Sequence, residues 1–339
     1  MALFTGALPL VPPAAGKGSG QQDKGPNVVA LGGGHGLAAS LSALRLLTSE
    51  LTAVVTVADD GGSSGRLREE YGVLPPGDLR MALSALCDDT DWGRTWRDVM
   101  QHRFRAGKGP GGSLDEHAMG NLLIVTLWEL LGDAVAGLKW AGALLGARGQ
   151  VLPMSTVPLT IEGDVRVTAP DGGTSLQTIR GQARCAVAGS LEEVRLLPEA
   201  APACTDALTA IELADWVVLG PGSWYTSVLP HLLLPEMRQA LCSTPAKRCL
   251  TMNLATDTKE TSGMTAADHL HVLRRYAPEF SVDVVLADPA SVPDRQEFEK
   301  AAGMLGAEVV LGKVGASGRR PVHEPLRLAT AYQDIFGNS

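Results

Sequence analysis

The sequence has few aromatic residues, few cysteines and no excess of positive charge, and each shortage excludes a class of protein. Its five cysteines among 339 residues lack CxxC spacing, which indicates reduced thiols rather than a disulfide framework or a structural zinc site. A formal net charge of −8 argues against nonspecific nucleic-acid binding, which needs a basic face. No uninterrupted apolar run is long enough for a membrane span. We therefore expect a cytoplasmic protein without a nucleic-acid partner.

The first 25 residues differ in composition from the rest of the chain. They are of low complexity, and their apolar start lacks basic residues and is broken by Pro9, Pro12 and Pro13, which makes a poor secretory signal. The remainder has the apolar content of a globular protein, since 45% of the whole chain is hydrophobic. We expect a disordered tail over 1–25 and one α/β domain over 26–339.

Strand-like and helix-like segments alternate along this domain. Val28–Leu31 and Leu51–Val57 have the composition of buried strands, and Leu37–Leu47 between them has one apolar helical face. This order predicts a Rossmann-like, mostly parallel sheet flanked by helices. Further helices are expected at Asp78–Cys87, Thr95–Phe104, Ala118–Leu130, Asp133–Leu145, His231–Cys242 and Ala266–Tyr276, and further strands at Trp216–Leu219, Arg248–Leu254, Val282–Ala287 and Glu308–Leu311.

The pattern changes over about 150–198, where short strand-like runs are separated by Pro, Gly and Asp. We expect a small β-rich insertion there, with strands at Val151–Thr156, Leu159–Glu162, Val165–Ala169 and Ala183–Ala188. A glycine-rich loop at Ala106–Gly112 is expected to be mobile, as lids beside ligand sites often are.

A glycine-rich loop follows the first predicted strand. Gly33, Gly34 and His35 stand where backbone N–H groups and a helix N-terminus would face a phosphate. The loop is not a Walker A motif, because no Gly-Lys-Ser/Thr follows, and its spacing fits a redox dinucleotide fingerprint poorly. A tight strand–helix turn without a ligand would also account for the glycines.

A second loop carries acidic and hydroxyl residues after the second strand. Asp59 and Asp60 can diverge past the strand end, one toward a ligand or cation and one toward the backbone. Ser63 and Ser64 can donate to a phosphate or cap a helix, and Arg66 can pair with a phosphate. A solvated loop before a capped helix is the alternative.

Four other segments add candidate ligand-binding residues. Asp78 can cap the helix after two prolines or join the site. His117 and Asn121 are four residues apart, so a helix places them on one face. The remaining candidates are the strand-end loop residues Gly222, Ser223, Tyr225 and Thr226, where Tyr225 could stack on a base, and Asn253.

Together these motifs resemble those of the YvcK-type gluconeogenesis factor family and, more distantly, of the 2-phospho-lactate transferases called CofD. The resemblance rests on GGGHGL at Gly32–Leu37, VTVADDGGSSGRLR at Val55–Arg68, LPPGDLR at Leu74–Arg80, HAMGNLLI at His117–Ile124, GPGSWYTSVLP at Gly220–Pro230, and ETSGMTAADH at Glu260–His269. It covers nearly all of residues 27–330 and implies a Rossmann-like fold with the ligand at the strand carboxyl ends.

The YvcK-type resemblance implies a regulatory protein that binds a UDP-sugar, notably UDP-N-acetylglucosamine, without turnover. It further implies a role in cell shape and in growth on gluconeogenic carbon sources. The transferase resemblance implies the alternative, in which a phospholactyl-type group moves from a nucleotide diphosphate-linked donor. Only in that case would Asp59 and Asp60 hold Mg²⁺, the one cofactor left open.

The sequence also leaves assembly and regulation open. A homodimer through the helical or β-rich region and a regulatory protein partner are both compatible with it. Exposed hydroxyls in the Thr256–Thr265 loop leave phosphorylation open, and the sequence does not identify the physiological nucleotide sugar.

Overall fold

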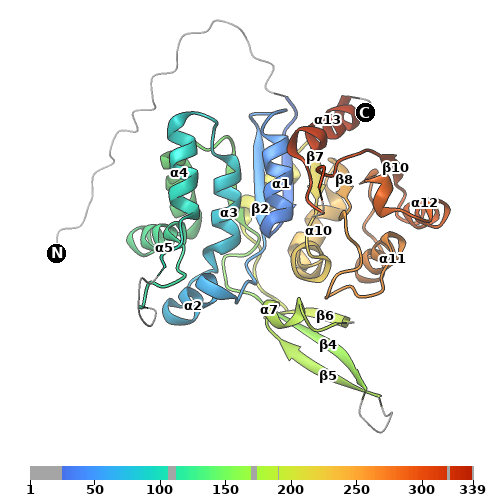
Figure 1. The fold of residues 1–339 in the computed structure, drawn as a ribbon, viewed down its shortest axis with the longest axis horizontal. Coiled ribbons are helices and arrows are strands. Elements are labelled where there is room, and N and C mark those ends of the chain that lie inside the picture. The colour runs from blue at the N-terminus through green and yellow to red at the C-terminus, as the bar shows by residue number, and fades with distance from the viewer. Residues whose placement is uncertain (1–24, 106–111, 169–173, 190, 319–320, 338–339) are drawn as a thin grey trace, which may run out of the picture.

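Seven parallel strands form the central sheet of the computed structural model, in the order β10-β9-β8-β7-β1-β2-β3 (Figure 1). The structure describes residues 25–105, 112–168, 174–189, 191–318 and 321–337. The sheet strands are β1 (Val28–Gly32), β2 (Leu51–Val55), β3 (Gln150–Pro153), β7 (Trp216–Leu219), β8 (Lys247–Thr251), β9 (Val284–Ala287) and β10 (Glu308–Leu311). The predicted α/β fold with a mostly parallel sheet is confirmed.

The centre of this sheet is its most apolar part. Every residue of β1 and β2 is buried, and Ala30 of β1 lies between Ala53 of β2 and Val218 of β7. Strands covered on both faces have continuous rather than alternating hydrophobic runs, as these do. This is why the sequence pattern located them.

Helices cover both faces of the sheet (Figure 1). Helix α1 packs against α3 and α13, and α5 packs against α6. The helices of the body are α1 (Gly34–Leu44), α2 (Gly62–Tyr71), α3 (Pro76–Leu86), α4 (Asp91–Gln101), α5 (Met119–Leu131), α6 (Ala134–Leu145), α8 (Thr205–Glu212), α9 (Pro230–Leu233), α10 (Pro235–Ser243), α11 (Ala266–Tyr276), α12 (Arg295–Gly303) and α13 (Pro325–Gly337), with a π-helical turn η1 (Trp224–Val228) and a 3₁₀ turn η2 (Pro289–Ser291).

The strand order reverses direction at β1. From β1 the chain adds β2 and β3 on one side, and it later adds β7 to β10 on the other. The loops that leave the carboxyl ends of β1 and β7 therefore run to opposite sides of the sheet. Open parallel sheets bind their ligands in the crevice that such a reversal creates.

A second, antiparallel sheet of three strands extends from the body (Figure 1). It consists of β4 (Thr160–Thr168), β5 (Thr174–Arg180) and β6 (Leu191–Leu197), with the short helix α7 (Gln182–Cys185) between β5 and β6. We call this segment the arm. A β-rich insertion was therefore rightly expected, although its sheet begins at 160, because β3 pairs with β2 in the central sheet.

Two predictions inside the arm are wrong. The strand expected at Ala183–Ala188 is helix α7, because Gly181, at φ 103°, turns the chain and the Asp60 carboxylate accepts the Ala183 N–H at 2.9 Å. The two runs expected at Leu159–Glu162 and Val165–Ala169 are parts of one strand over 160–168, since Gly163 and Asp164 remain paired with both β5 and β6. Ala169 lies outside the described residues.

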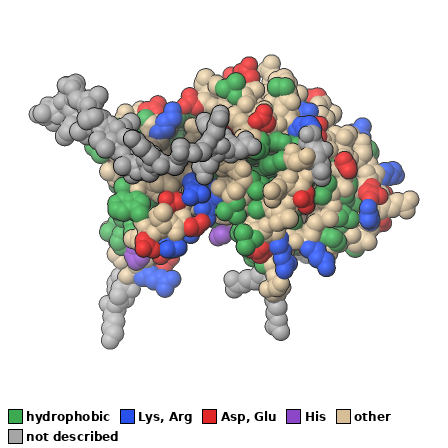
Figure 2. Space-filling view, turned by 90° about the horizontal axis from the view of Figure 1, so that it is seen from above, with side chains coloured by type: hydrophobic (Ala, Val, Ile, Leu, Met, Phe, Trp, Pro, Cys, Tyr) green, Lys and Arg blue, Asp and Glu red, His purple; other side chains and the backbone are tan. Residues whose placement is uncertain are grey.

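Parts of the sequence predictions fall beyond the described residues, namely 1–24 of the expected tail and 106–111 of the expected mobile loop. Within the described ranges, no helix combines the length and the apolar character that crossing a bilayer requires. On the face shown in Figure 2, acidic and basic side chains are interspersed rather than separated by sign.

Candidate functional site

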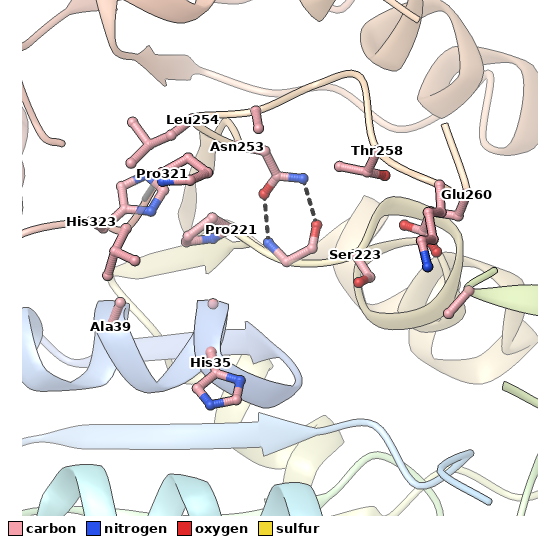
Figure 3. A pocket seen from close by; sticks show the side chains of 16 residues that line it. His35, Ala39, Pro221, Ser223, Asn253, Leu254, Thr258, Glu260, Pro321 and His323 are labelled. Carbon is pink, nitrogen blue, oxygen red and sulfur yellow. Dashed lines mark hydrogen bonds between the residues drawn. The ribbon is translucent and has the colours of Figure 1, made fainter. Parts of the chain in front are cut away.

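A pocket of about 450 Å³ lies at the carboxyl ends of β1, β7 and β8, where the strand order reverses (Figure 3). We call it the switch-point pocket. Four segments line it: the start of α1, the loop after β7, the loop after β8, and the segment before α13. Their lining residues are His35, Gly36, Ala39, Pro221, Gly222, Ser223, Asn253, Leu254, Ala255, Thr258, Lys259, Glu260, Pro321, Val322 and His323, together with Ala186 next to α7.

Asn253 fixes the loop after β7. Its side-chain Oδ1 accepts the Gly222 N–H at 2.9 Å, and its Nδ2 donates to the Gly222 carbonyl at 2.7 Å (Figure 3). This pair of bonds ties the β7 loop to the β8 loop across one wall of the pocket. Of the sequence-predicted residues, Asn253, Gly222, Ser223 and His35 line the pocket.

Helix α1 begins against that same loop. A β-carbon on Gly36 would lie 2.1 Å from the Pro221 carbonyl oxygen, so only glycine allows this approach. The α1 N-cap, Gly33, offers no side-chain capping bond, and the first turn carries no acidic residue. The start of this 11-residue helix suits an anion, and there the Gly34 N–H donates to the Asp78 carboxylate.

Glu260, from the loop after β8, is a buried carboxylate in the pocket wall. It is only 4% exposed, and its Oε2 accepts the Thr226 hydroxyl at 3.2 Å. Its Oε1 lies 3.4 Å from the Tyr225 N–H, at the start of η1. Burial raises the pKa of Glu260 to about 7, although these donors act in the opposite direction. Carboxyl groups with such values occur often at functional sites.

His323 is a pocket residue that the patterns missed. It is 8% exposed, and its Nε2 has no hydrogen-bond partner among the described residues. Burial lowers the pKa of His323, so the ring is neutral near pH 7. His323 lies in none of the recognised motifs, so only its burial reveals it.

Beside the pocket, two aspartates approach the turn that begins α1. A β-carbon on Gly33 would lie 2.5 Å from both the Asp78 Oδ2 and the Thr56 Oγ1. A β-carbon on Gly77, at the start of α3, would lie 3.1 Å from the Asp59 Oδ2. Burial and the nearby Asp59 charge raise the pKa of Asp78 to about 6, while the Gly34 N–H and Arg80 lower it. Burial likewise raises the pKa of Asp59.

Asp60 does not join these carboxylates. Its side chain is bonded to the backbone of α7, in the arm, whereas Asp59 accepts the Gly61 N–H at 3.0 Å and faces Asp78. The two adjacent aspartates thus diverge, Asp60 toward the arm and Asp59 toward Gly61 and Asp78. In the part of the chain that the structure describes, no three His, Cys, Asp or Glu side chains are grouped as metal ligands.

Three further predicted residues belong to one buried hydrogen-bond network. The Ser63 hydroxyl oxygen accepts the Ala118 N–H at 3.3 Å and the Asn121 Nδ2 at 3.0 Å, and it lies 3.1 Å from His117 Nδ1. With both acceptor positions used, the Ser63 proton is donated to Nδ1. His117 is therefore neutral with its proton on Nε2, and burial lowers its pKa in agreement.

Buried Arg80 completes this network, and the sequence predictions did not name it. Its Nε donates to Asn121 Oδ1 at 2.9 Å, and its charge stabilises the ionised forms of Asp78 and Asp59. Arg80 thus connects the Ser63 network to the two aspartates. Ser64 lies in the same region, where its hydroxyl oxygen accepts the Gly77 N–H at 3.0 Å beside Asp59.

The other predicted residues lie away from the pocket cavity. Tyr225 lines a different hollow, with Met264 and Arg275, so the structure does not place its ring where it could stack on a pocket ligand. Thr226 is buried behind Glu260. Arg66 donates to the Asp115 carbonyl at 2.6 Å, next to the Ser63 network.

Comparisons with known proteins agree with this architecture. A family model described as "2-phospho-L-lactate transferase CofD" matches residues 28–319. A "putative gluconeogenesis factor" of Mycobacterium leprae is 49% identical over 314 residues, which cover 91% of this chain and 86% of that protein. The "gluconeogenesis factor" of Bacillus subtilis is 34% identical over 280 residues, which cover 81% and 84%.

Solved structures show the same similarity. The crystal structure of a protein member of the upf0052 family from Bacillus halodurans superposes with a TM-score of 0.78 at 33% sequence identity. The superposition covers 91% of this chain and 98% of that one. The similarity therefore extends over most of both chains.

Proposed function

The chain belongs to the CofD family, and we propose that it is a regulatory protein whose switch-point pocket binds a UDP-sugar, with UDP-N-acetylglucosamine as the first candidate. The observation that carries the proposal is the pocket at the strand-order reversal, bordered by the start of α1. Sites in this position of open α/β sheets bind nucleotides, with phosphates at the helix N-terminus.

The size and the lining of the pocket support a ligand of this class. Its volume, about 450 Å³, falls in the usual range for small-molecule sites. Leu254, Pro221 and Pro321 offer apolar surface for a base or sugar ring, and Ser223 and His35 offer polar groups at the rim. This combination of apolar walls and a few polar groups is typical of nucleotide and cofactor pockets.

The physiological part of the proposal rests on the relatives. Proteins of Mycobacterium leprae and Bacillus subtilis that resemble this chain over most of their length are named as gluconeogenesis factors. We extend that role to this chain: it supports growth on gluconeogenic carbon sources and cell shape from the cytoplasm, and a partner protein reads the ligand-bound state.

Calorimetric titration of the purified protein tests the binding. We expect UDP-N-acetylglucosamine to bind and to be recovered intact, and GDP and NADH to bind more weakly. Ala39→Phe fills the pocket from α1 and should reduce the affinity at least about tenfold. The matched control is Ala210→Phe, which places the same side chain in a hollow at the amino ends of β1 to β3.

Two results would refute the proposal. One is a folded protein that binds no UDP-sugar at millimolar concentration. The other is equal loss of binding in the two phenylalanine variants, because that would place the ligand outside the switch-point pocket.

A transferase is the second candidate. It is favoured by two carboxylates, since Asp78 lies close to Gly33 and Asp59 lies close to Gly77. Carboxylate and hydroxyl oxygens are the ligands that Mg²⁺ prefers, and Thr56 adds a hydroxyl at this point. Asp59 and Asp78, not Asp60, would hold the ion, which would neutralise charge on a diphosphate leaving group. Metal-dependent consumption of a nucleotide-linked donor, lost in Asp78→Asn but retained in Asp60→Asn, would support it.

A further inference from the structure

We propose that Glu260 is a ligand-facing residue of the switch-point pocket and that it takes up a proton when an anionic nucleotide ligand binds. The inference rests on the proposed function, since it concerns the same pocket. It adds a role for Glu260 and a regulatory consequence, because proton uptake makes the affinity depend on pH.

The position of Glu260 carries the first step. The residue lines the pocket, yet it is 4% exposed, so its carboxylate is held in the wall rather than in solvent. Three donors of η1 hold it: the Thr226 hydroxyl and the backbone N–H groups of Tyr225 and Trp224. These donors already satisfy acceptor positions of the carboxylate, so the Trp224 and Tyr225 N–H groups are used by Glu260 rather than by a ligand phosphate.

The surroundings of Glu260 carry the second step. No described cationic side chain forms an ion pair with it. The titratable groups whose pKa values its charge raises are the Cys185 thiol of α7 and the Tyr225 phenol of η1, both neutral near pH 7. Lys259 is exposed beside it, and on the α11 side the buried His269 stacks on Trp224 and is neutral as well.

An anionic ligand then changes the protonation equilibrium of this group. A diphosphate in the pocket adds negative charge next to a carboxylate that has no counterion, and like charge favours the protonated form. The added proton removes the repulsion and provides an O–H donor for the ligand. Since the unliganded carboxyl group titrates near pH 7, binding takes up a proton at and above that pH.

The sign of the pH effect follows from this uptake. Raising the pH ionises Glu260 in the free protein. The anionic ligand then either binds beside a negative charge or binds together with a proton, and part of the binding free energy is used in both cases. Affinity for UDP-N-acetylglucosamine should therefore fall as the pH rises, by at most about tenfold per pH unit for one proton. The ligand itself contributes no such change, because a diphosphate diester stays ionised throughout this range.

The experiment is calorimetric titration with UDP-N-acetylglucosamine between about pH 7 and about pH 8.5, in buffers of different ionisation enthalpy. The wild-type protein should take up close to one proton at the upper pH. Glu260→Gln keeps the shape of the side chain and one acceptor oxygen for the η1 N–H groups, and the Thr226 hydroxyl can turn to accept from its amide nitrogen. Because glutamine cannot titrate, this variant should bind with little pH dependence and more tightly than wild type at high pH. Glu299→Gln, an exposed residue of α12, is the matched control and should behave as wild type.

The outcomes separate this inference from the proposed function. Binding without proton uptake, or with the same pH dependence in Glu260→Gln, overturns the role of Glu260 and leaves the UDP-sugar site intact. If no variant binds a UDP-sugar, the proposed function fails instead.

Infrared spectroscopy tests the protonation without any ligand. The free wild-type protein should show a carbonyl band of a protonated carboxyl group near pH 7 that is missing in Glu260→Gln. An identical spectrum of the two proteins in this band would refute the buried, proton-holding state on which the inference depends.

Discussion

At the scale of single residues, the Ser63 network shows how a residue predicted to bind a ligand can instead organise the protein interior. Ser63→Ala leaves the Ala118 N–H, the Asn121 amide and His117 Nδ1 without their shared partner. Buried polar groups without partners cost about 1–3 kcal/mol, so we expect the free energy of unfolding to fall by that amount.

Urea denaturation followed by circular dichroism measures this change. The control is Ser243→Ala, whose exposed hydroxyl bonds only its own helix and whose loss should change stability by less than about 0.5 kcal/mol. If Ser63→Ala is as stable as wild type but no longer binds a UDP-sugar, Ser63 is a ligand residue, as its place in the sequence motif indicates.

The residue scale also shows what the sequence could predict of the site. Gly33, Gly222 and Asn253 were predictable because glycine and polar residues directly after a buried strand commonly line the ligand site of an open α/β sheet. Glu260 was recognisable as a polar residue of a family motif, but its burial against η1 was not. His323 was not predictable, because it lies in no motif and only its burial in the pocket wall reveals it. Tyr225 was assigned to stacking from its residue type, and the helical turn directs it to another hollow.

At the scale of elements, Asp60 connects the loop after β2 to the arm. The N-cap of α7, Gly181, has no side chain to cap the helix, and the Asp60 carboxylate fills that role from another element. We expect Asp60→Ala to weaken α7 locally by about 0.5–2 kcal/mol, as loss of a helix cap does. Hydrogen exchange of the Gln182–Cys185 amides should become faster, while the central sheet keeps its protection.

The control for the arm is Asp91→Ala, which removes an exposed carboxylate from the first turn of α4. It should leave exchange in α7 unchanged. Unaltered exchange in Asp60→Ala, combined with loss of UDP-sugar binding, would contradict the capping role and return Asp60 to the ligand site.

The arm is also where the secondary-structure prediction failed. Strands of the central sheet were located well because burial on both faces makes them continuously apolar, as in β1 and β2. The arm has one exposed face, and β5 is exposed at six of its seven residues, so its apolar signal is weak. Helix α7 depends on a cap that comes from residue 60, and no local pattern contains that information.

At the scale of the whole molecule, the site exists because two halves of one sheet meet at β1. One half supplies α1 and the aspartates after β2, and the other supplies the loops after β7 and β8. The sequence predicted the alternation of strands and helices, but not which strand lies beside β1. That neighbour is β7, nearly 190 residues later, and its position decides which loops share a pocket.

Gly36 is the point where these halves touch most closely, and it gives the molecular-scale prediction. In Gly36→Ala the new β-carbon would lie 2.1 Å from the Pro221 oxygen and 2.8 Å from the Gly222 α-carbon, so the backbone must move. Overpacking of this kind costs about 1–3 kcal/mol. Gly303→Ala is the matched control, because nothing lies within 4 Å of its β-carbon position, and it should stabilise helix α12 by about 0.4–1 kcal/mol.

In Gly36→Ala, the free energy of unfolding and the affinity for the UDP-sugar should both fall. The reason is that the contact between α1 and the loop after β7, which joins the two halves of the sheet, also sets the width of the switch-point pocket. Loss of stability with unchanged affinity would mean that the pocket walls adjust independently of this contact. Unchanged stability and affinity would mean that α1 and the β7 loop separate without cost. The joint between the halves would then not define the ligand site, and the loop after β8 alone would have to do so.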